Sequence, residues 1–304
     1  MWRTVAPWFL VLGLVSACDQ IEALREQILG GGGADSGNQR SPELQGAIDL
    51  YESGQLQAAA DQLQTVTLTE PGSADAFYYM GRCYLGLAAA TGDTADPAAE
   101  LSPEEAQSLD AFNTALTLNP RHADAAMGIG DLYARRVPIK RSRRKGQEPE
   151  AQQLARGAYE KAVTIDPKQP ESQRRYAVFL ERLGQMEDAE VAHKAAVDAA
   201  RSNTDLAPEY YTAYGRFLAS QNGRSEEAID QLELAQMVRG EDPVLQGEIA
   251  SLYSHMGHQY FEEKRYSLAE QTLTKAYQMF PDKSDPDAQK TSSTLNRLRA
   301  IRGR

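Results

Sequence analysis

Small and large apolar residues recur along the chain in a fixed order that ends in proline. A small residue is followed after four positions by a large one, and after three more by a residue that is usually Ala. The pattern reads Ala59-Leu63-Val66-Pro71, Ser108-Phe112-Ala115-Pro120, Ala155-Tyr159-Ala162-Pro167 and Ala269-Leu273-Ala276-Pro281, and without the proline Ala189-His193-Ala196. Offsets of four and three place side chains on one face of a helix, and Pro cannot continue the helix. Each copy therefore predicts an amphipathic helix that stops at a turn.

A second helix with small residues on its packing side is predicted ahead of each of these. The small residues lie where two helices would touch: Met80-Gly81, Ile129-Gly130, Tyr176-Ala177, Tyr214-Gly215 and Met256-Gly257. A helix pair that cannot bury its own apolar face must stack on a neighbouring pair. The pattern therefore predicts an all-α solenoid.

These residues resemble the tetratricopeptide repeat (TPR), a helix-turn-helix unit of about 34 residues. The match is closest in Ala250–Lys283, with Tyr253, Met256, Gly257, Tyr260, Ala269, Leu273, Ala276 and Pro281 in the expected places. Further copies are Arg40–Pro71, Ala74–Pro120, Ala123–Pro167, Pro170–Asn203 and Pro208–Gly240. The resemblance implies a right-handed superhelical TPR solenoid of about six repeats with a C-terminal capping helix.

The chain is expected to divide into four parts. Residues 1–17 would be a signal peptide, 18–40 a lipid-attached N-terminus with a Gly-rich linker, 41–284 the TPR array and 285–304 the capping helix. The array would carry insertions near 86–103 and 136–150. Such a cap gives the last apolar face of a solenoid a polar outer cover.

The N-terminus suggests the compartment. A positive start, an apolar run from Val5 to Val15 and small residues before Cys18 are typical of a secretory signal peptide. Val15-Ser16-Ala17-Cys18 resembles the lipobox of bacterial lipoproteins, which implies a lipid anchor (palmitate among its acyl groups) on Cys18 and a protein that faces the periplasm. Ordinary secretion is the alternative. Asp19 resembles an inner-membrane retention signal, and an outer-membrane location stays open.

Composition argues against a nucleic-acid partner. The chain has 304 residues, 41% of them hydrophobic, and a formal charge of -11. An acidic surface disfavours nucleic acid and anionic lipid as main partners. Cys83 is the only other cysteine, and we expect it to be a buried small apolar residue.

One dense basic run interrupts this acidity. It comprises Arg135, Arg136, Lys140, Arg141, Arg143, Arg144 and Lys145. The hypothesis is a basic contact loop for lipid phosphates or an acidic protein. A solvated loop is the alternative.

No residue pattern indicates chemistry. His255 and His258 have helical spacing, but no third metal ligand accompanies them. Gly-rich phosphate loops and nucleophile elbows are absent from the sequence. We expect no enzyme activity, no metal and no cofactor.

The resemblance also implies where a partner would bind. TPR grooves are lined by first-helix positions two, five, nine and twelve, which here include Tyr78, Arg82, Met127, Asp131, Arg174, Val178, Arg216 and His258. Their arginines suit a carboxylate, because a guanidinium can bond two oxygens at once. The hypothesis is a concave groove for an extended or helical peptide that carries acidic groups.

The sequence thus predicts a membrane-tethered TPR scaffold that binds partner proteins in envelope assembly. Its layout is similar to that of type IV pilus pilotins and of lipoprotein subunits of outer-membrane assembly machines. Two alternatives stay open: an envelope hydrolase or metal-dependent enzyme with a TPR substrate arm, and a self-associating structural protein. The oligomeric state is left open.

Overall fold

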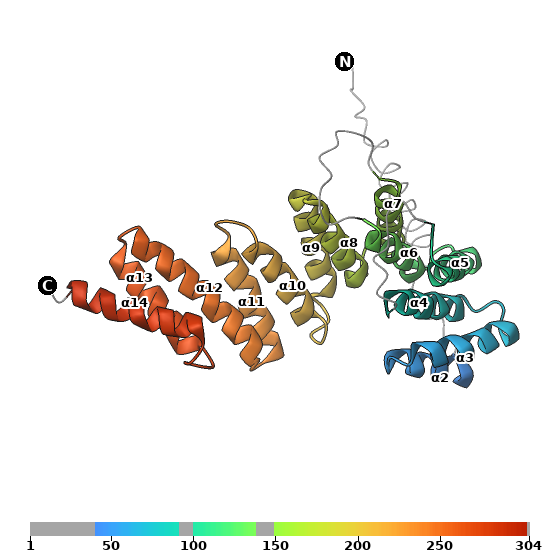
Figure 1. Cartoon of the computed structure of the whole chain (residues 1–304), viewed down its shortest axis with the longest axis horizontal. Coiled ribbons are helices and arrows are strands. Elements are labelled where there is room, and N and C mark those ends of the chain that lie inside the picture. The colour runs from blue at the N-terminus through green and yellow to red at the C-terminus, as the bar shows by residue number, and fades with distance from the viewer. Residues whose placement is uncertain (1–39, 91–99, 138–148, 303–304) are drawn as a thin grey trace, which may run out of the picture.

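The fold is a right-handed solenoid of paired helices. A computed structural model describes residues 40–90, 100–137 and 149–302, and in these ranges it contains thirteen helices and no strand. The helices are α2 (Pro42–Glu52), α3 (Leu56–Thr69), α4 (Ala74–Ala90), α5 (Pro103–Leu118), α6 (Ala123–Arg135), α7 (Glu150–Ile165), α8 (Pro170–Leu183), α9 (Met186–Ala200), α10 (Ala207–Ala219), α11 (Ser225–Arg239), α12 (Pro243–Glu262), α13 (Tyr266–Met279) and α14 (Pro286–Arg302). Six antiparallel pairs, from α2–α3 to α12–α13, stack in chain order along one long axis (Figure 1). The predicted fold class is therefore confirmed.

Helix starts and ends follow from local sequence. Ser102 and Glu105 form a capping box at the start of α5, with the Ser102 hydroxyl accepting from the Glu105 backbone N–H. Asp242 caps α12 by accepting from the backbone N–H groups of Val244 and Leu245. Gly184 ends α8 at φ 72°, a left-handed conformation that glycine adopts without strain. Such local contacts fix where each of these helices begins or ends.

Glycines on the first helix of a pair pack against large side chains that project from the second helices. The ring of Phe112 on α5 lies against both Gly81 on α4 and Gly128 on α6; a Cβ would lie 2.7 Å from it at Gly81 and 2.5 Å at Gly128. Gly130 meets Tyr159 in the same way, and Gly257 meets Leu273. The small residues of the sequence pattern thus set how closely neighbouring helices approach.

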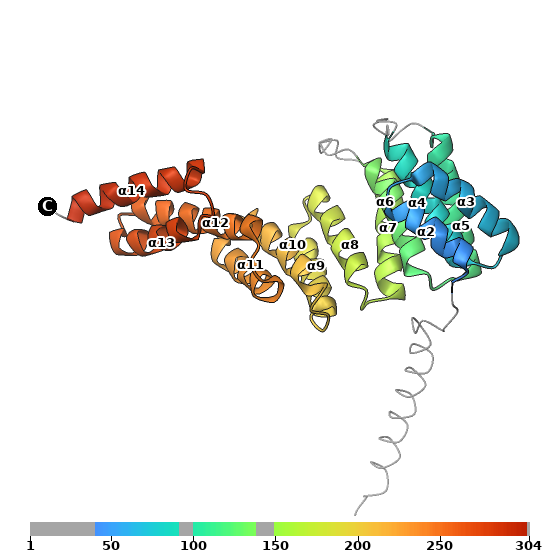
Figure 2. The same ribbon diagram turned by 90° about the horizontal axis from the view of Figure 1, so that it is seen from below.

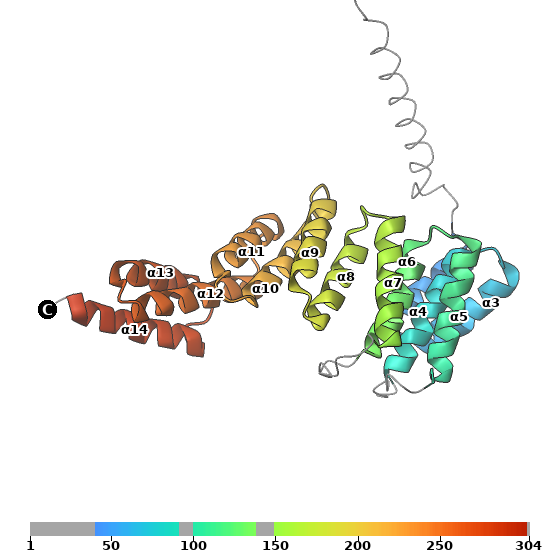
Figure 3. The ribbon, with the colours of Figure 1, turned by 90° about the horizontal axis from the view of Figure 1, so that it is seen from above.

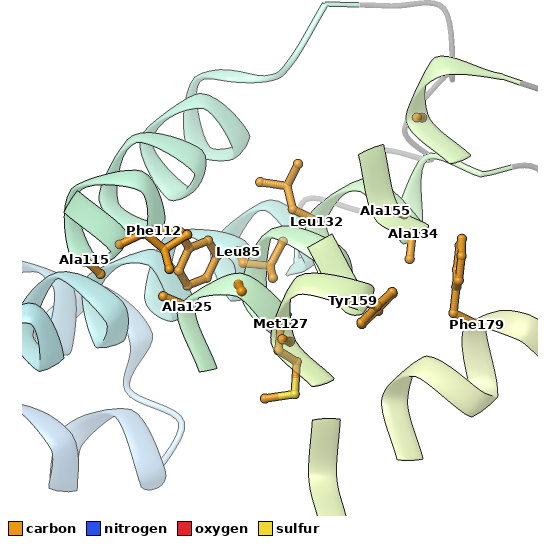
Figure 4. Close-up of a cluster of buried hydrophobic side chains, with 14 of the residues drawn as sticks. Leu85, Phe112, Ala115, Ala125, Met127, Leu132, Ala134, Ala155, Tyr159 and Phe179 are labelled. Atoms are coloured by element: carbon orange, nitrogen blue, oxygen red, sulfur yellow. The ribbon is translucent and has the colours of Figure 1, made fainter. Parts of the chain in front are cut away.

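The core runs along the solenoid between the two helix layers. Its largest cluster spans α4 to α8, and Phe112, Met127, Tyr159 and Phe179 are among its large side chains (Figure 4). Cys83 on α4 is fully buried in the adjoining cluster that α4 forms with α2 and α3. That placement agrees with the predicted role as a small apolar residue.

The last helix, α14, follows the sixth helix pair and packs against it. Helix α14 packs on α12 and α13 through Ala288, Leu295 and Leu298, whereas Ile301 is 43% exposed. Helix α12 begins at Pro243, well before the Ala250 at which the sequence pattern starts its last repeat. This first helix of the last pair contacts α14 as well as α13.

The array is elongated, with the first repeat and α14 at opposite ends (Figures 2 and 3). Among the described helices none is long and apolar enough to cross a bilayer. The predicted signal peptide, Cys18, Asp19 and the predicted Gly-rich linker lie outside the described residues.

Candidate functional site: a belt of ion pairs and a hollow

The first helix of every pair contributes to one series of polar contacts. These helices are α2, α4, α6, α8, α10 and α12. The series, which we call the first-helix belt, comprises Tyr51, Arg82, Asp131, Glu171, Arg174, Arg175, Glu209, Arg216 and Glu248.

The belt begins at Arg82 on α4. Its Nε donates to the Tyr51 hydroxyl of α2 at 3.1 Å, and its Nη1 donates to Asp131 Oδ2 of α6 at 3.0 Å. Asp131 also accepts from the Tyr159 hydroxyl at 2.8 Å and from Arg175 Nη1 of α8. One carboxylate on α6 therefore joins arginines from the first helices on either side.

Glu171 extends the belt along α8. It accepts from Arg174 Nε and Nη2 at 2.9 and 2.8 Å and from Arg175 Nε at 2.5 Å. Burial opposes ionisation of Glu171, but the hydrogen bonds from the two arginines outweigh it and lower the pKa of Glu171. The carboxylate thus remains charged at neutral pH.

The belt then reaches the C-terminal repeats. Arg174 lies 3.9 Å from Glu209 of α10, and Arg216 on α10 bonds both oxygens of Glu248 on α12, at 2.9 and 2.6 Å. Because Glu209 and Arg216 are two helical turns apart on α10, they share a face. The belt therefore follows one side of the array from α2 to α12.

A hollow of about 570 Å³ opens between α10 and α12, where the belt ends. Its walls are largely apolar, and Val244 in its lining is 69% exposed. Its charged residues are Arg216, Glu248, Asp282 and Asp285. Hydrogen bonds from Ser284 lower the pKa of Asp282, so this carboxylate is charged at neutral pH. Because Arg216 and Glu248 neutralise each other, the two aspartates leave the rim negative.

The structure brings the three predicted groove arginines into the belt. Each of Arg82, Arg174 and Arg216 already contacts a carboxylate of this chain. A ligand carboxylate would have to displace an internal one. Val178 is 41% exposed, as a groove residue requires.

Other predicted groove residues are differently placed. Met127 is 2% exposed, with its sulfur 3.8 Å from the Ser172 hydroxyl, so it belongs to the core and cannot contact a ligand. Tyr78 is half-buried beside Phe112 and His122, and burial raises the pKa of its hydroxyl.

The predicted groove residue His258 is partly covered, and its neighbour His255 on α12 is the exposed one. His258 is half-buried, with Nδ1 2.6 Å from the Ser254 carbonyl oxygen and Nε2 3.2 Å from Thr294 of α14, whereas His255 is exposed. The capping helix thus covers the side that the repeat pattern assigns to the groove. No group of three metal-ligating side chains occurs among the residues that the structure describes.

The predicted contact role of the basic run is wrong for its first two residues, Arg135 and Arg136. Arg136 is 4% exposed and pairs with Glu105, and Arg135 donates to the Leu85 and Ala88 carbonyl oxygens at 3.1 and 3.2 Å. Both side chains hold α6 to its neighbours and are not free for a lipid or an acidic protein. Lys140, Arg141, Arg143, Arg144 and Lys145 lie outside the described residues.

Sequence reasoning missed four charged members of the belt. Glu171 and Glu209 directly follow the prolines that open their repeats, so they occupy repeat position two, the first of the four groove positions, and that position was an available signal. Arg175 and Glu248 lie outside the four groove positions. Their pairing depends on the stacking of the repeats, which no single repeat encodes.

Comparison with known proteins supports the architecture. The sequence model of the tetratricopeptide repeat matches residues 44–100 and 106–170. A thermophilic TPR protein of Thermus thermophilus is 22% identical over 69% of this chain and 96% of its own length, with a TM-score of 0.51. Pseudomonas aeruginosa pilF is 13% identical over 84% of this chain and 97% of its own, with a TM-score of 0.52. No significant match was found among curated proteins.

Proposed function

We propose that this TPR solenoid is a membrane-tethered scaffold lipoprotein that binds partner proteins in envelope assembly. Solenoids of this kind present extended surfaces to other proteins. The observation that supports partner binding is the hollow between α10 and α12, because it joins exposed apolar lining to the charged first-helix belt. The tether rests on the lipobox-like sequence Val15-Ser16-Ala17-Cys18 alone.

The hollow favours one class of ligand. Val244 and the apolar walls suit an aliphatic or aromatic side chain of a peptide, since such anchors supply much of the binding energy at interfaces. Asp282 and Asp285 favour a neighbouring Lys or Arg on that peptide. The proposed ligand is therefore a peptide segment with an apolar anchor and an adjacent basic residue, in place of the acidic peptide inferred from the arginines alone.

Site-directed photocrosslinking tests this surface. A photoreactive residue at position 244 is expected to capture a defined partner from intact cells, and the variant Asp282→Lys/Asp285→Lys should weaken that capture. The control position is Met237 on α11, which is 78% exposed but does not line the hollow. Equal capture at 237 and 244 would reject the hollow as the binding surface.

The membrane tether is tested separately. The proposal places a lipid on Cys18 and the array in the periplasm, at the inner membrane if Asp19 acts as a retention signal. Labelling with a fatty-acid analogue should mark the wild type and not Cys18→Ala, and the variant should leave the membrane fraction. A labelled Cys18→Ala protein would contradict the anchor.

The second half of the basic run stays a prediction. Lys140, Arg141, Arg143, Arg144 and Lys145 would contact lipid phosphates or an acidic protein. Binding of anionic vesicles by the wild type and by a variant with all five charges reversed tests the lipid contact. Equal binding by the two proteins would reject it.

A further inference from the structure

The charges of the two ends of the array have opposite sign. Residues 41–81 contain no Lys or Arg and six acids, namely Glu43, Asp49, Glu52, Asp61, Glu70 and Asp75. In α14 the residues after Asp287 include no acid, and the basic ones are Lys290, Arg297, Arg299 and Arg302. A protein of net charge -11 thus ends in a basic helix.

Several of these terminal charges have no ion-pair partner within the described part of the chain. In the middle of the array, acids and arginines pair across helices, as Arg82 and Asp131 do. By contrast, Glu43 and Glu52 on α2 and Lys290 and Arg299 on α14 are exposed and take part in no such pair there. Arg297 is also exposed and lies over the Phe261 ring at 4.8 Å.

The two charged surfaces lie at opposite ends of the solenoid. Helix α2 uses Leu44, Ala47 and Ile48 for the core and leaves Glu43 and Glu52 exposed. Helix α14 buries Leu295 and Leu298 and leaves Lys290, Arg297 and Arg299 exposed. Figure 1 shows the two helices at the far ends of the array. One molecule cannot bring them together.

We propose that copies of this chain associate head to tail, with the basic face of α14 on one copy docked against the acidic first repeat of the next. A second copy satisfies both ends at once, whereas an anionic membrane would satisfy α14 alone. Because the contact joins two different surfaces, each growing assembly keeps one free acidic and one free basic end, and association can continue beyond a dimer.

Sedimentation of the full-length protein over a range of concentrations tests the proposal. At low salt the average mass should rise past twice the mass of the monomer. It should return to the monomer value near ~0.5 M salt, because screening shortens the Debye length from about 10 Å at 0.1 M towards about 3 Å at 1 M.

Two charge reversals are expected to abolish this association. The first is Lys290→Glu/Arg299→Glu in α14, and the second is Glu43→Lys/Glu52→Lys in α2. Each variant alone should remain monomeric, because one of its two contacting surfaces has lost its exposed complementary charges. A mixture of both variants should associate again, because the unaltered acidic first repeat of one variant can meet the unaltered basic α14 of the other.

A matched control separates the end charges from net charge alone. Lys161→Glu/Lys168→Glu changes two exposed lysines in mid-array and should assemble like the wild type. Circular dichroism shows whether each variant is folded, and recovery in the mixture excludes a folding defect.

Three results would overturn the proposal. The first is a wild type that is monomeric at every concentration and salt, and the second is association unchanged by both reversals. Monomers that bind anionic vesicles through α14 would also overturn it, in favour of a lipid surface. None of these results depends on the hollow between α10 and α12. A failure of the head-to-tail proposal would therefore not contradict the proposed scaffold function.

Discussion

Arg136 Nη1 donates a hydrogen bond to Glu105 Oε2 at 2.6 Å, and both side chains are only 5% exposed. The pair joins the end of α6 to the first turn of α5, where Glu105 also completes the capping box with Ser102. A residue of the basic run that suggested a contact site thus stabilises the packing of two repeats.

Removal of one partner of this buried pair should be strongly destabilising. Arg136→Met leaves the Glu105 carboxylate buried without its cation, and we expect a loss of about 3–5 kcal/mol in the free energy of unfolding. Urea denaturation measures this change. Arg136→Met/Glu105→Gln should recover most of the loss, because Gln keeps the capping box without a charge. A single variant as stable as wild type would contradict the role of the pair.

The close contact of Gly128 with Phe112 and the open surroundings of Gly157 predict opposite effects for Gly→Ala changes at these two positions. Gly128→Ala should destabilise by about 1–3 kcal/mol because the new methyl group overlaps the ring. The control is Gly157→Ala on α7, where no side chain or neighbouring helix lies within 4 Å of the added Cβ. That change should stabilise by about 0.5–1 kcal/mol through helix propensity. Thermal unfolding compares the two, and equal shifts would show that Phe112 yields freely.

Acid should destabilise the junction of the fourth and fifth repeats through Glu190. Hydrogen bonds from Arg224 and Lys194 outweigh a smaller effect of burial and lower the pKa of Glu190 from 4.5 to about 2. The unfolded chain therefore binds the proton first, so this contribution is complete above pH 4.5 and is lost as pH falls towards 2. Unfolding measured across that window should show a shallower pH dependence in Glu190→Gln than in wild type. Asp110→Asn, at an exposed acid without an ion pair in the described structure, should leave the slope unchanged.

The Cys83 thiol should be almost unreactive in the native protein. Burial raises the pKa of Cys83 to about 12, against a smaller opposing effect of Arg82, and the side chain is fully buried. The thiolate is the reactive form, so alkylation at pH ~8 in a Cys18→Ala background should be at least about 100-fold slower than in the denatured chain. Fast labelling under native conditions would show that the first two repeats open readily.

The sequence by itself determined the helices and their pairing. Apolar spacing of four and three, small residues on the first helices and proline stops act within one repeat, so they predicted six helix pairs and a cap that the structure confirms. The same local pattern placed Gly81 and Phe112 at helix contacts, but only the structure shows that Phe112 lies against both Gly81 and Gly128.

Only the tertiary structure decided which polar side chains are available to a partner. Asp131 pairs with Arg82, 49 residues earlier in the sequence, and with Arg175, 44 residues later. Neither separation equals the repeat length, so the repeat pattern does not predict these pairs. Likewise, Met127 and His258 occupy groove positions of the repeat, yet α8 contacts the buried Met127 and α14 covers His258. Burial and charge pairing at such positions depend on how far each repeat turns relative to the next. That rotation is set by packing between repeats, because no single repeat contains both sides of the contact.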